Sequence, residues 1–174
     1  VLDPDPNTTS GPSIVTALET SGLPPEYSTS FPSNLSDYQV VFCCLGVYPD
    51  NHVLSTSEGQ LLADFLNSGG NLYMEGADTW AYDPQTPVHS MFNIIGLSDG
   101  SGDMGVLSGI PGSFADGINM SYDGENSWMD RLDAASPAAA VLGQLVPQLR
   151  GAHVGHGRAS QQQRAGELPG REPR

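Results

Sequence analysis

Hydrophobic residues follow one another without interruption at residues 40–45, Val-Val-Phe-Cys-Cys-Leu, and Gly46 ends the run. An apolar run of this length is typical of a strand that is covered on both faces. A second short strand is predicted at residues 71–75, Asn-Leu-Tyr-Met-Glu. The pattern therefore predicts two strands separated by a segment with a different periodicity.

That intervening segment has the pattern of an amphipathic helix. Four apolar residues recur at helical spacing and would face a sheet: Leu61, Leu62, Phe65 and Leu66. Ser55 and Glu58 have the spacing of a capping box, in which the serine hydroxyl accepts from a helical N–H and the glutamate reaches back. Gly69 and Gly70 end the helix. Because a helix joins the two strands, they are predicted to be parallel, with a right-handed crossover.

The remaining elements are predicted from weaker patterns. Val1 and Leu2 are interpreted as the end of a first strand, and residues 14–18 as the apolar side of a short helix that Gly22 ends. Further candidates are an edge strand at 26–30, a short helix at 88–96, and strands at 118–122 and 138–142. In chain order these elements predict an α/β fold of the flavodoxin-like type, with a doubly wound, mainly parallel sheet and helices on both faces.

The pattern changes after Gly143, so we expect the α/β domain to occupy residues 1–143. Residues 144–174 are rich in Gly, Gln and Arg and contain few large apolar side chains. Such a segment cannot bury enough surface to offset its ordering entropy, which predicts an irregular or disordered tail. The alternative is a frameshifted or truncated end, which would leave the sheet without its last strands.

Charge narrows the range of partners. The chain has a net charge of −14 and no lysine, and Arg131 is the only Arg or Lys in residues 1–149. An acidic surface repels nucleic acid and anionic membranes, and no apolar run approaches the roughly 20 residues of a membrane helix. We therefore expect no nucleic-acid partner and no membrane insertion. The acidity suits a secreted or surface protein in a cation-rich medium, although solubility alone would also explain it.

Candidate ligand-binding residues follow from the predicted sheet, because ligands of open parallel sheets bind at the carboxyl ends of the strands. Three such ends carry polar or aromatic residues: Asp3, Asp5, Tyr48, Glu75, Asp78 and Trp80. Carboxylate oxygens are ligands for hard cations, so Asp3, Asp5 and Asp78 are candidates for a calcium or magnesium site. The alternative is that Asp3 and Asp78 cap loops through local hydrogen bonds.

Two further patterns have some features of a chemical site. Residues 97–103, Leu-Ser-Asp-Gly-Ser-Gly-Asp, resemble a calcium loop but lack the closing Glu of an EF-hand, so a flexible turn is the simpler interpretation. A nucleophile elbow needs Ser or Cys at a strand-to-helix turn, and the turn after Met74 reads Glu-Gly-Ala-Asp-Thr. Cys43 and Cys44 are expected to be small buried hydrophobes inside a strand. No catalytic residue is assigned.

Residues 38–46, 61–70 and 71–80 resemble the class I glutamine amidotransferase-like fold, in a divergent branch, and residues 66–80 are the most distinctive part of the match. This branch occurs as an accessory domain of large secreted or surface bacterial proteins. Amidotransferases have a catalytic cysteine at the elbow and a His–Glu pair late in the chain. Here the elbow region reads Gly-Ala-Asp at 76–78 and no late His-x-Glu occurs, so the resemblance implies the scaffold without the chemistry.

The sequence is compatible with two functions. The first is a non-catalytic accessory or interaction domain of a larger extracellular bacterial protein, binding a neighbouring module of the parent chain, a peptide or a glycan. The start at Val1, inside a predicted strand, fits a piece of a longer or processed chain. The alternative is a carboxylate- or metal-dependent hydrolase in which paired carboxylates divide the acid and base roles. Its candidate residues are Asp3, Asp5, Glu75 and Asp78.

Overall fold

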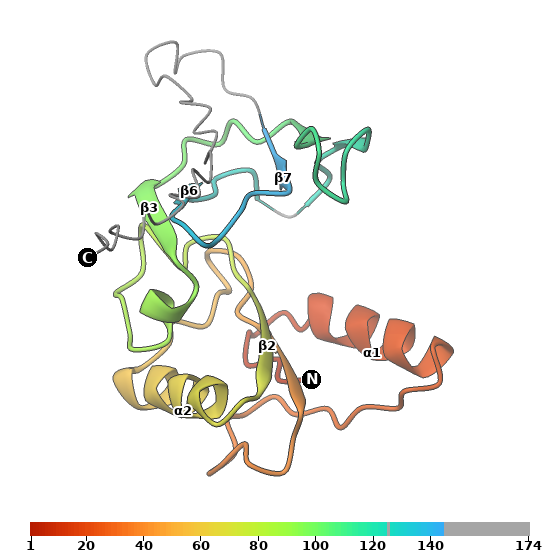
Figure 1. Cartoon of the computed structure of the whole chain (residues 1–174), viewed down its shortest axis with the longest axis vertical. Helices are drawn as coiled ribbons and strands as arrows, with labels where there is room; N and C mark the ends of the chain where they lie inside the picture. Colours follow the sequence, from red (N-terminus) through yellow and green to blue (C-terminus); the bar gives the residue numbers. More distant parts are fainter. Residues whose placement is uncertain (125, 145–174) are drawn as a thin grey trace, which may run out of the picture.

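The structure is a computed structural model that describes residues 1–124 and 126–144 (Figure 1). The elements in this part of the chain are α1 (Ser10–Thr20), β1 (Val40–Cys44), α2 (Thr56–Asn67), β2 (Asn71–Glu75), the 3₁₀ helix η1 (His89–Met91), β3 (Ile94–Ser98), β4 (Val106–Gly109), β5 (Asn119–Ser121), β6 (Arg131–Ala134) and β7 (Leu142–Gly143). All of the predicted tail except Gln144 lies outside the described residues.

The central βαβ unit agrees with the sequence pattern. β1 and β2 pair in parallel, with Val41 opposite Leu72, and α2 connects them. The Ser55 hydroxyl accepts from the Glu58 backbone N–H at 3.3 Å, and the Glu58 carboxylate accepts from the Ser55 N–H at 2.8 Å. The predicted capping box is therefore present, and it satisfies backbone donors that the first helical turn leaves unpaired.

The hydrophobic core lies between α2 and the β1–β2 pair. α2 buries Leu62 and Phe65, and the strands contribute Val41, Cys43 and Met74 to the same cluster. Both cysteines are free and buried, as the sequence predicted. The apolar stripe of one helix and the unbroken run of one strand thus account for half of the buried residues in this core.

Helix α1 packs more loosely. Gly11 is its only buried residue, and a Cβ at that position would lie 2.1 Å from the Asp3 Oδ2 atom. The predicted apolar side at residues 14–18 stays partly exposed, and a cavity of about 570 Å³ separates α1 from Phe42 and Tyr73. The N-terminal segment pairs with β1 through an isolated parallel bridge between Leu2 and Cys43.

Beyond residue 90 the described strands pair in antiparallel fashion. β3 pairs with β6, with Ser98 opposite Arg131, and β4 pairs with both β5 and β7. Figure 1 shows these strands on the opposite side of the molecule from α2. The prediction of strand at 118–122 is confirmed by β5, whereas the predicted helix at 88–96 is a single 3₁₀ turn followed by β3.

The predicted fold class is therefore wrong. The described residues form one two-stranded parallel sheet and two small antiparallel sheets, with two α-helices in all, and not a doubly wound parallel sheet with helices on both faces. The physical reason is that only one crossover helix with a buried stripe follows a strand. After Trp80 the chain is rich in Gly, Asp and Ser, and short strands joined by loops pair locally in antiparallel order.

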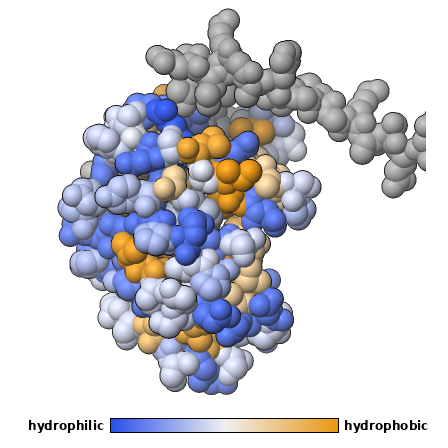
Figure 2. Space-filling view, turned by 90° about the vertical axis from the view of Figure 1, so that its left-hand side faces the viewer, coloured by the Kyte–Doolittle hydropathy of each residue, from blue (hydrophilic) through white to orange (hydrophobic). Residues whose placement is uncertain are grey.

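The surface is mixed in character. Figure 2 shows a mostly hydrophilic face on which hydrophobic residues form separate groups. Within residues 1–124 and 126–144, no helix is both long and apolar enough to cross a membrane.

Candidate metal centre and its pocket

The loop that follows β2 supplies the first carboxylate of the site. The chain leaves β1 at Gly46, whose φ of +78° favours glycine, and the Ala77 N–H donates to the Gly46 carbonyl at 3.1 Å. This bond holds the loops after β1 and β2 together. Asp78 follows directly and is 5% exposed, and its Oδ2 accepts from the Tyr48 N–H at 3.3 Å. Two strand ends thus place Tyr48 beside a buried acid.

The segment before β6 supplies a second carboxylate. Asp130 Oδ2 accepts from the Trp80 N–H at 2.8 Å and from the Ala81 N–H at 2.7 Å. The Asp130 N–H donates to the Ala77 carbonyl at 2.8 Å. These hydrogen bonds connect the start of β6 to the loop after β2. The other carboxylate oxygen of Asp130, Oδ1, is buried without a hydrogen-bond partner among the described residues.

The third carboxylate comes from the end of β3. Ser98 pairs with Arg131, so the next residue on one strand, Asp99, lies beside the preceding residue on the other, Asp130. Oxygen atoms of Asp78, Asp99 and Asp130 all lie within 4.8 Å of one another. Such a group of carboxylates can hold a metal ion, and it is the only group of three or more acid, histidine or cysteine side chains at this spacing in the described part of the chain.

Like charges and burial dominate the electrostatics of this group. Burial raises the pKa of Asp78, the carboxylates of Asp130 and Asp99 raise it further, and the Tyr48 N–H opposes the shift. The nearby Asp83 has its pKa raised from 3.8 to about 6, chiefly by burial and then by Asp78 and Asp130. Both shifts are those expected of acids that share a site without a counter-ion.

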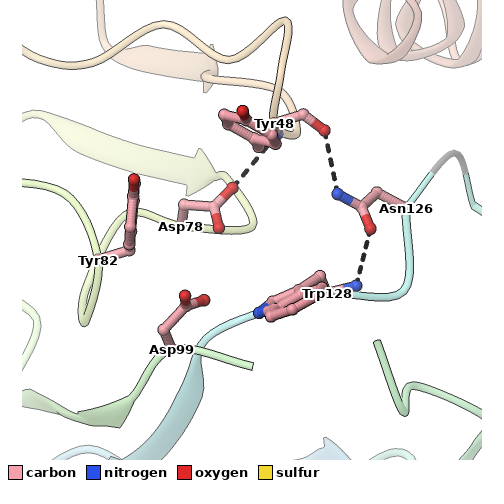
Figure 3. Close-up of a pocket in the computed structure, with 6 residues that line it drawn as sticks. All are labelled: Tyr48, Asp78, Tyr82, Asp99, Asn126 and Trp128. Atoms are coloured by element: carbon pink, nitrogen blue, oxygen red, sulfur yellow. Dashed lines mark hydrogen bonds between the residues drawn. The ribbon is translucent and has the colours of Figure 1, made fainter. Parts of the chain in front are cut away.

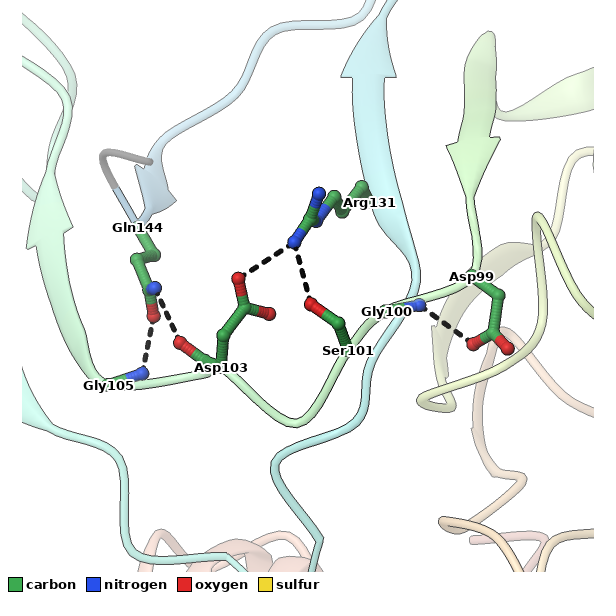
Figure 4. A network of polar contacts seen from close by, with 7 residues as sticks. All are labelled: Asp99, Gly100, Ser101, Asp103, Gly105, Arg131 and Gln144. Atoms are coloured by element: carbon green, nitrogen blue, oxygen red, sulfur yellow. Dashed lines mark hydrogen bonds and ion pairs between the residues drawn. The ribbon is translucent and has the colours of Figure 1, made fainter. Parts of the chain in front are cut away.

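The one basic side chain nearby is engaged elsewhere. Arg131 pairs with Asp103 at 2.7 Å and donates to the Ser101 hydroxyl at 2.9 Å (Figure 4). Gln144 and Gly105 extend the same network, whereas Asp99 contacts only the Gly100 N–H within it. The three clustered carboxylates consequently have no Arg or Lys partner among the described residues.

Asp83 gives this electrostatic picture a pH dependence. Between about pH 4 and pH 6 the folded chain holds more protons on Asp83 than the unfolded chain, so the free energy of unfolding falls as pH rises through this window. Replacing Asp83 with Asn should remove that part of the slope. Urea denaturation in EDTA across the window measures it, with the exposed Asp123→Asn as the charge-matched control. Equal slopes in the wild type and Asp83→Asn would contradict the assignment.

A cavity of about 280 Å³ opens beside the cluster (Figure 3). Its walls combine two of the three carboxylates with aromatic and amide side chains: Tyr48, Asp78, Tyr82, Asp99, Asn126 and Trp128. Asn126 connects two of the walls, because its Nδ2 donates to the Tyr48 carbonyl at 3.1 Å and its Oδ1 accepts from the Trp128 N–H at 2.9 Å. We call this cavity the aromatic pocket.

The sequence-predicted residues are divided among several environments. Tyr48 and Asp78 line the aromatic pocket. Asp5 and Glu75 line a different cavity of about 380 Å³ at the start of α1, where Asp5 accepts from the Thr8 N–H at 2.7 Å. Glu75 also accepts from the Tyr73 hydroxyl at 2.7 Å.

The other two predicted residues are buried. Asp3 is fully buried and accepts from the Tyr27 hydroxyl at 2.7 Å. Trp80 packs edge-on against His89 and Phe92 within the core. Of the three candidate metal ligands, only Asp78 belongs to the carboxylate group that the structure assembles.

Sequence reasoning missed several residues of the site. Asp99 lies in residues 97–103, which resemble a calcium loop but were interpreted as a flexible turn, so that pattern was a usable signal. Asp130, Asn126 and Trp128 carry no local signal, because the pairing of β3 with β6 brings them to the loop after β2.

Comparisons of the chain with known proteins identified no related protein. No protein-family model matches the chain, and no curated protein and no solved structure was found to match it. The resemblance to class I glutamine amidotransferase-like domains therefore stays a prediction.

Proposed function

We propose that this chain is a non-catalytic binding domain of a larger extracellular protein, and that Asp78, Asp99 and Asp130 hold a calcium ion in it. The observation that carries the proposal is the approach of three carboxylates within 4.8 Å with no Arg or Lys partner among the described residues. Assembling like charges is costly unless a cation compensates them. A cation-rich extracellular medium would supply one, in keeping with the net charge of −14.

The number of carboxylates favours calcium over magnesium. Ca²⁺ takes six to eight oxygen ligands in a flexible geometry, whereas Mg²⁺ keeps several waters and is usually bound through one or two carboxylates. Three carboxylates whose oxygens lie within 4.8 Å of one another are therefore more typical of a Ca²⁺ site. The unpartnered Oδ1 of Asp130 supports the same assignment, because a cation would satisfy it.

A binding role also has more support than the alternative function, a carboxylate-dependent hydrolase. The four carboxylates named for hydrolysis do not gather in one site: Asp78 lines the aromatic pocket and Asp3 is buried against Tyr27. Asp5 and Glu75 share a cavity, but each already accepts a hydrogen bond, from the Thr8 N–H and from the Tyr73 hydroxyl. A pair that divides acid and base roles must reach one substrate. The cysteines lie in β1, where burial raises the pKa of Cys43 to about 12 and suppresses the thiolate.

Calcium titration calorimetry tests the proposal. We expect one site per chain in the wild type and at least a tenfold loss of affinity in Asp99→Asn. Asp99 is exposed, and asparagine retains the Oδ1 that accepts from Gly100 at 2.7 Å, so the fold should be preserved. Asp123→Asn removes the same charge from an exposed position outside the cluster and should bind calcium as the wild type does. Absence of calcium binding, or equal losses in the two variants, would overturn the proposal.

A further inference from the structure

Three aromatic side chains are left open to solvent around the carboxylate group. Tyr48, Tyr82 and Trp128 are 57%, 60% and 50% exposed, and all three line the aromatic pocket. Single exposed aromatic residues are ordinary, but three that face one cavity offer a ligand broad apolar surfaces. Figure 3 shows Asp78 among the three rings and Asp99 next to Trp128.

The walls are also held in place. Asn126 uses both ends of its amide to connect the Tyr48 carbonyl with the Trp128 N–H, and the Asp78 carboxylate accepts from the Tyr48 N–H. Asn126 is therefore a positioning residue that fixes Tyr48 relative to Trp128. A pocket that is organised before binding loses less conformational entropy when a ligand enters.

The cavity retains acceptors for a polar ligand. Asp78 is buried, yet among the described residues its second carboxylate oxygen makes no hydrogen bond, and the pocket also contains Asp99. If calcium binds at the three carboxylates, it borders the pocket through two of its ligands. Calcium takes six to eight oxygens, so three carboxylates leave positions that a ligand's hydroxyl groups can fill.

Size and charge limit the class of ligand. A volume of about 280 Å³ is just below the usual range of about 300–1,000 Å³ for ligand sites, which favours one ring over an extended chain. None of the described residues that line the pocket is Arg or Lys, and the net charge is −14, so anionic ligands are disfavoured. A neutral, polyhydroxylated ring with an apolar face satisfies both limits.

We propose that the aromatic pocket binds one pyranose residue of a neutral glycan, with a face of the sugar stacked on Trp128 and two of its hydroxyls coordinated to the calcium ion. The inference rests on the proposed function, because it requires the ion at Asp78, Asp99 and Asp130. Beyond calcium binding, the proposal specifies a ligand, the surface that recognises this ligand and a requirement for calcium in recognition. Asn126 serves recognition indirectly, by holding the backbone segments of the two rings.

An array of neutral oligosaccharides, probed with the whole chain in calcium buffer, tests this assignment. We expect binding to glycans that end in a pyranose, with at least a tenfold loss in EDTA. Trp128→Ala should lose at least tenfold in affinity, whereas Trp128→Phe should retain most of it because the stacking face remains. Phe114 is 89% exposed and lies outside the pocket, so Phe114→Ala is the matched control and should bind as the wild type does.

Tryptophan fluorescence gives a second readout. The chain has two tryptophans, and Trp80 is 8% exposed while Trp128 is 50% exposed. A glycan from the array that covers Trp128 should shift the emission of the wild type to shorter wavelength, and the shift should be absent in Trp128→Phe.

The outcomes separate this inference from the proposed function. Calcium binding by calorimetry, together with no neutral glycan on the array or with unchanged binding in Trp128→Ala, overturns the inference and leaves the calcium site in place. Failure of calcium binding overturns both. Oligolysine is the comparison probe, because the same carboxylates and rings could hold an ammonium group. Oligolysine binding that calcium abolishes, without glycan binding, would likewise overturn the glycan assignment.

Discussion

Replacing Leu62 with alanine should lower the free energy of unfolding by about 2–5 kcal/mol. Leu62 has no exposed surface, and it belongs to the core cluster that α2 forms with β1 and β2. The substitution removes buried methyl groups and leaves a cavity that close-packed neighbours fill only in part. Urea denaturation followed by circular dichroism measures the change.

The matched control is the same substitution at an exposed position. Leu23 is 64% exposed, so Leu23→Ala should change the free energy of unfolding by less than about 0.5 kcal/mol. Similar effects of the two substitutions would contradict the packing of α2 against the parallel pair. A changed denaturant slope in Leu62→Ala alone would instead indicate that the variant no longer unfolds in two states.

Calcium at about 100 times its dissociation constant should raise the free energy of unfolding by about 2.7 kcal/mol. The physical reason is that only the folded chain brings together Asp78, Asp99 and Asp130, which lie far apart in the sequence. For a chain of this size the gain corresponds to a rise in the melting temperature of roughly 5–10 °C. Differential scanning calorimetry in EDTA and in calcium measures it.

Two comparisons make the result specific. Asp99→Asn should lose most of the calcium-dependent rise, and Asp123→Asn should keep it. Magnesium at the same concentration should produce a smaller rise, because Mg²⁺ loses its bound waters reluctantly and is usually held by only one or two carboxylates. An equal rise in Asp99→Asn and in the wild type would place the calcium at another site.

The same ion would connect two parts of the fold. Asp78 belongs to the loop after the parallel strand β2, whereas Asp99 and Asp130 flank the antiparallel pair of β3 and β6. Without the ion the described contacts between these parts include the bonds from Trp80 and Ala81 to Asp130. Calcium binding at the edge of the aromatic pocket is therefore expected to stabilise the contact between these two parts of the fold.

The sequence predicted well those features that depend on neighbouring residues. The capping box of Ser55 and Glu58 needs only a spacing of three residues, and the buried run of β1 needs only consecutive apolar side chains. A single crossover helix between two strands then fixes their parallel pairing. The extension of this unit into a doubly wound sheet failed, because it assumed that the later strands join the same sheet.

The candidate site shows the same division. Asp78 and Tyr48 were predicted from their positions at strand ends, and both line the aromatic pocket. Trp80, chosen by the same argument, turns into the core and packs against His89 and Phe92. A position in a loop does not determine the direction of a side chain, since burial of the indole decides it.

By itself, the sequence determined the local elements around α2, the acidity of the chain and one acid of the site. Only the tertiary structure decided which carboxylates meet, because the register of β3 against β6 places Asp99 beside Asp130 and two backbone bonds then hold Asp130 at the loop of Asp78. Strand register and long-range hydrogen bonds join residues that no local spacing relates. The three-acid group and the aromatic pocket therefore exist only in the folded chain.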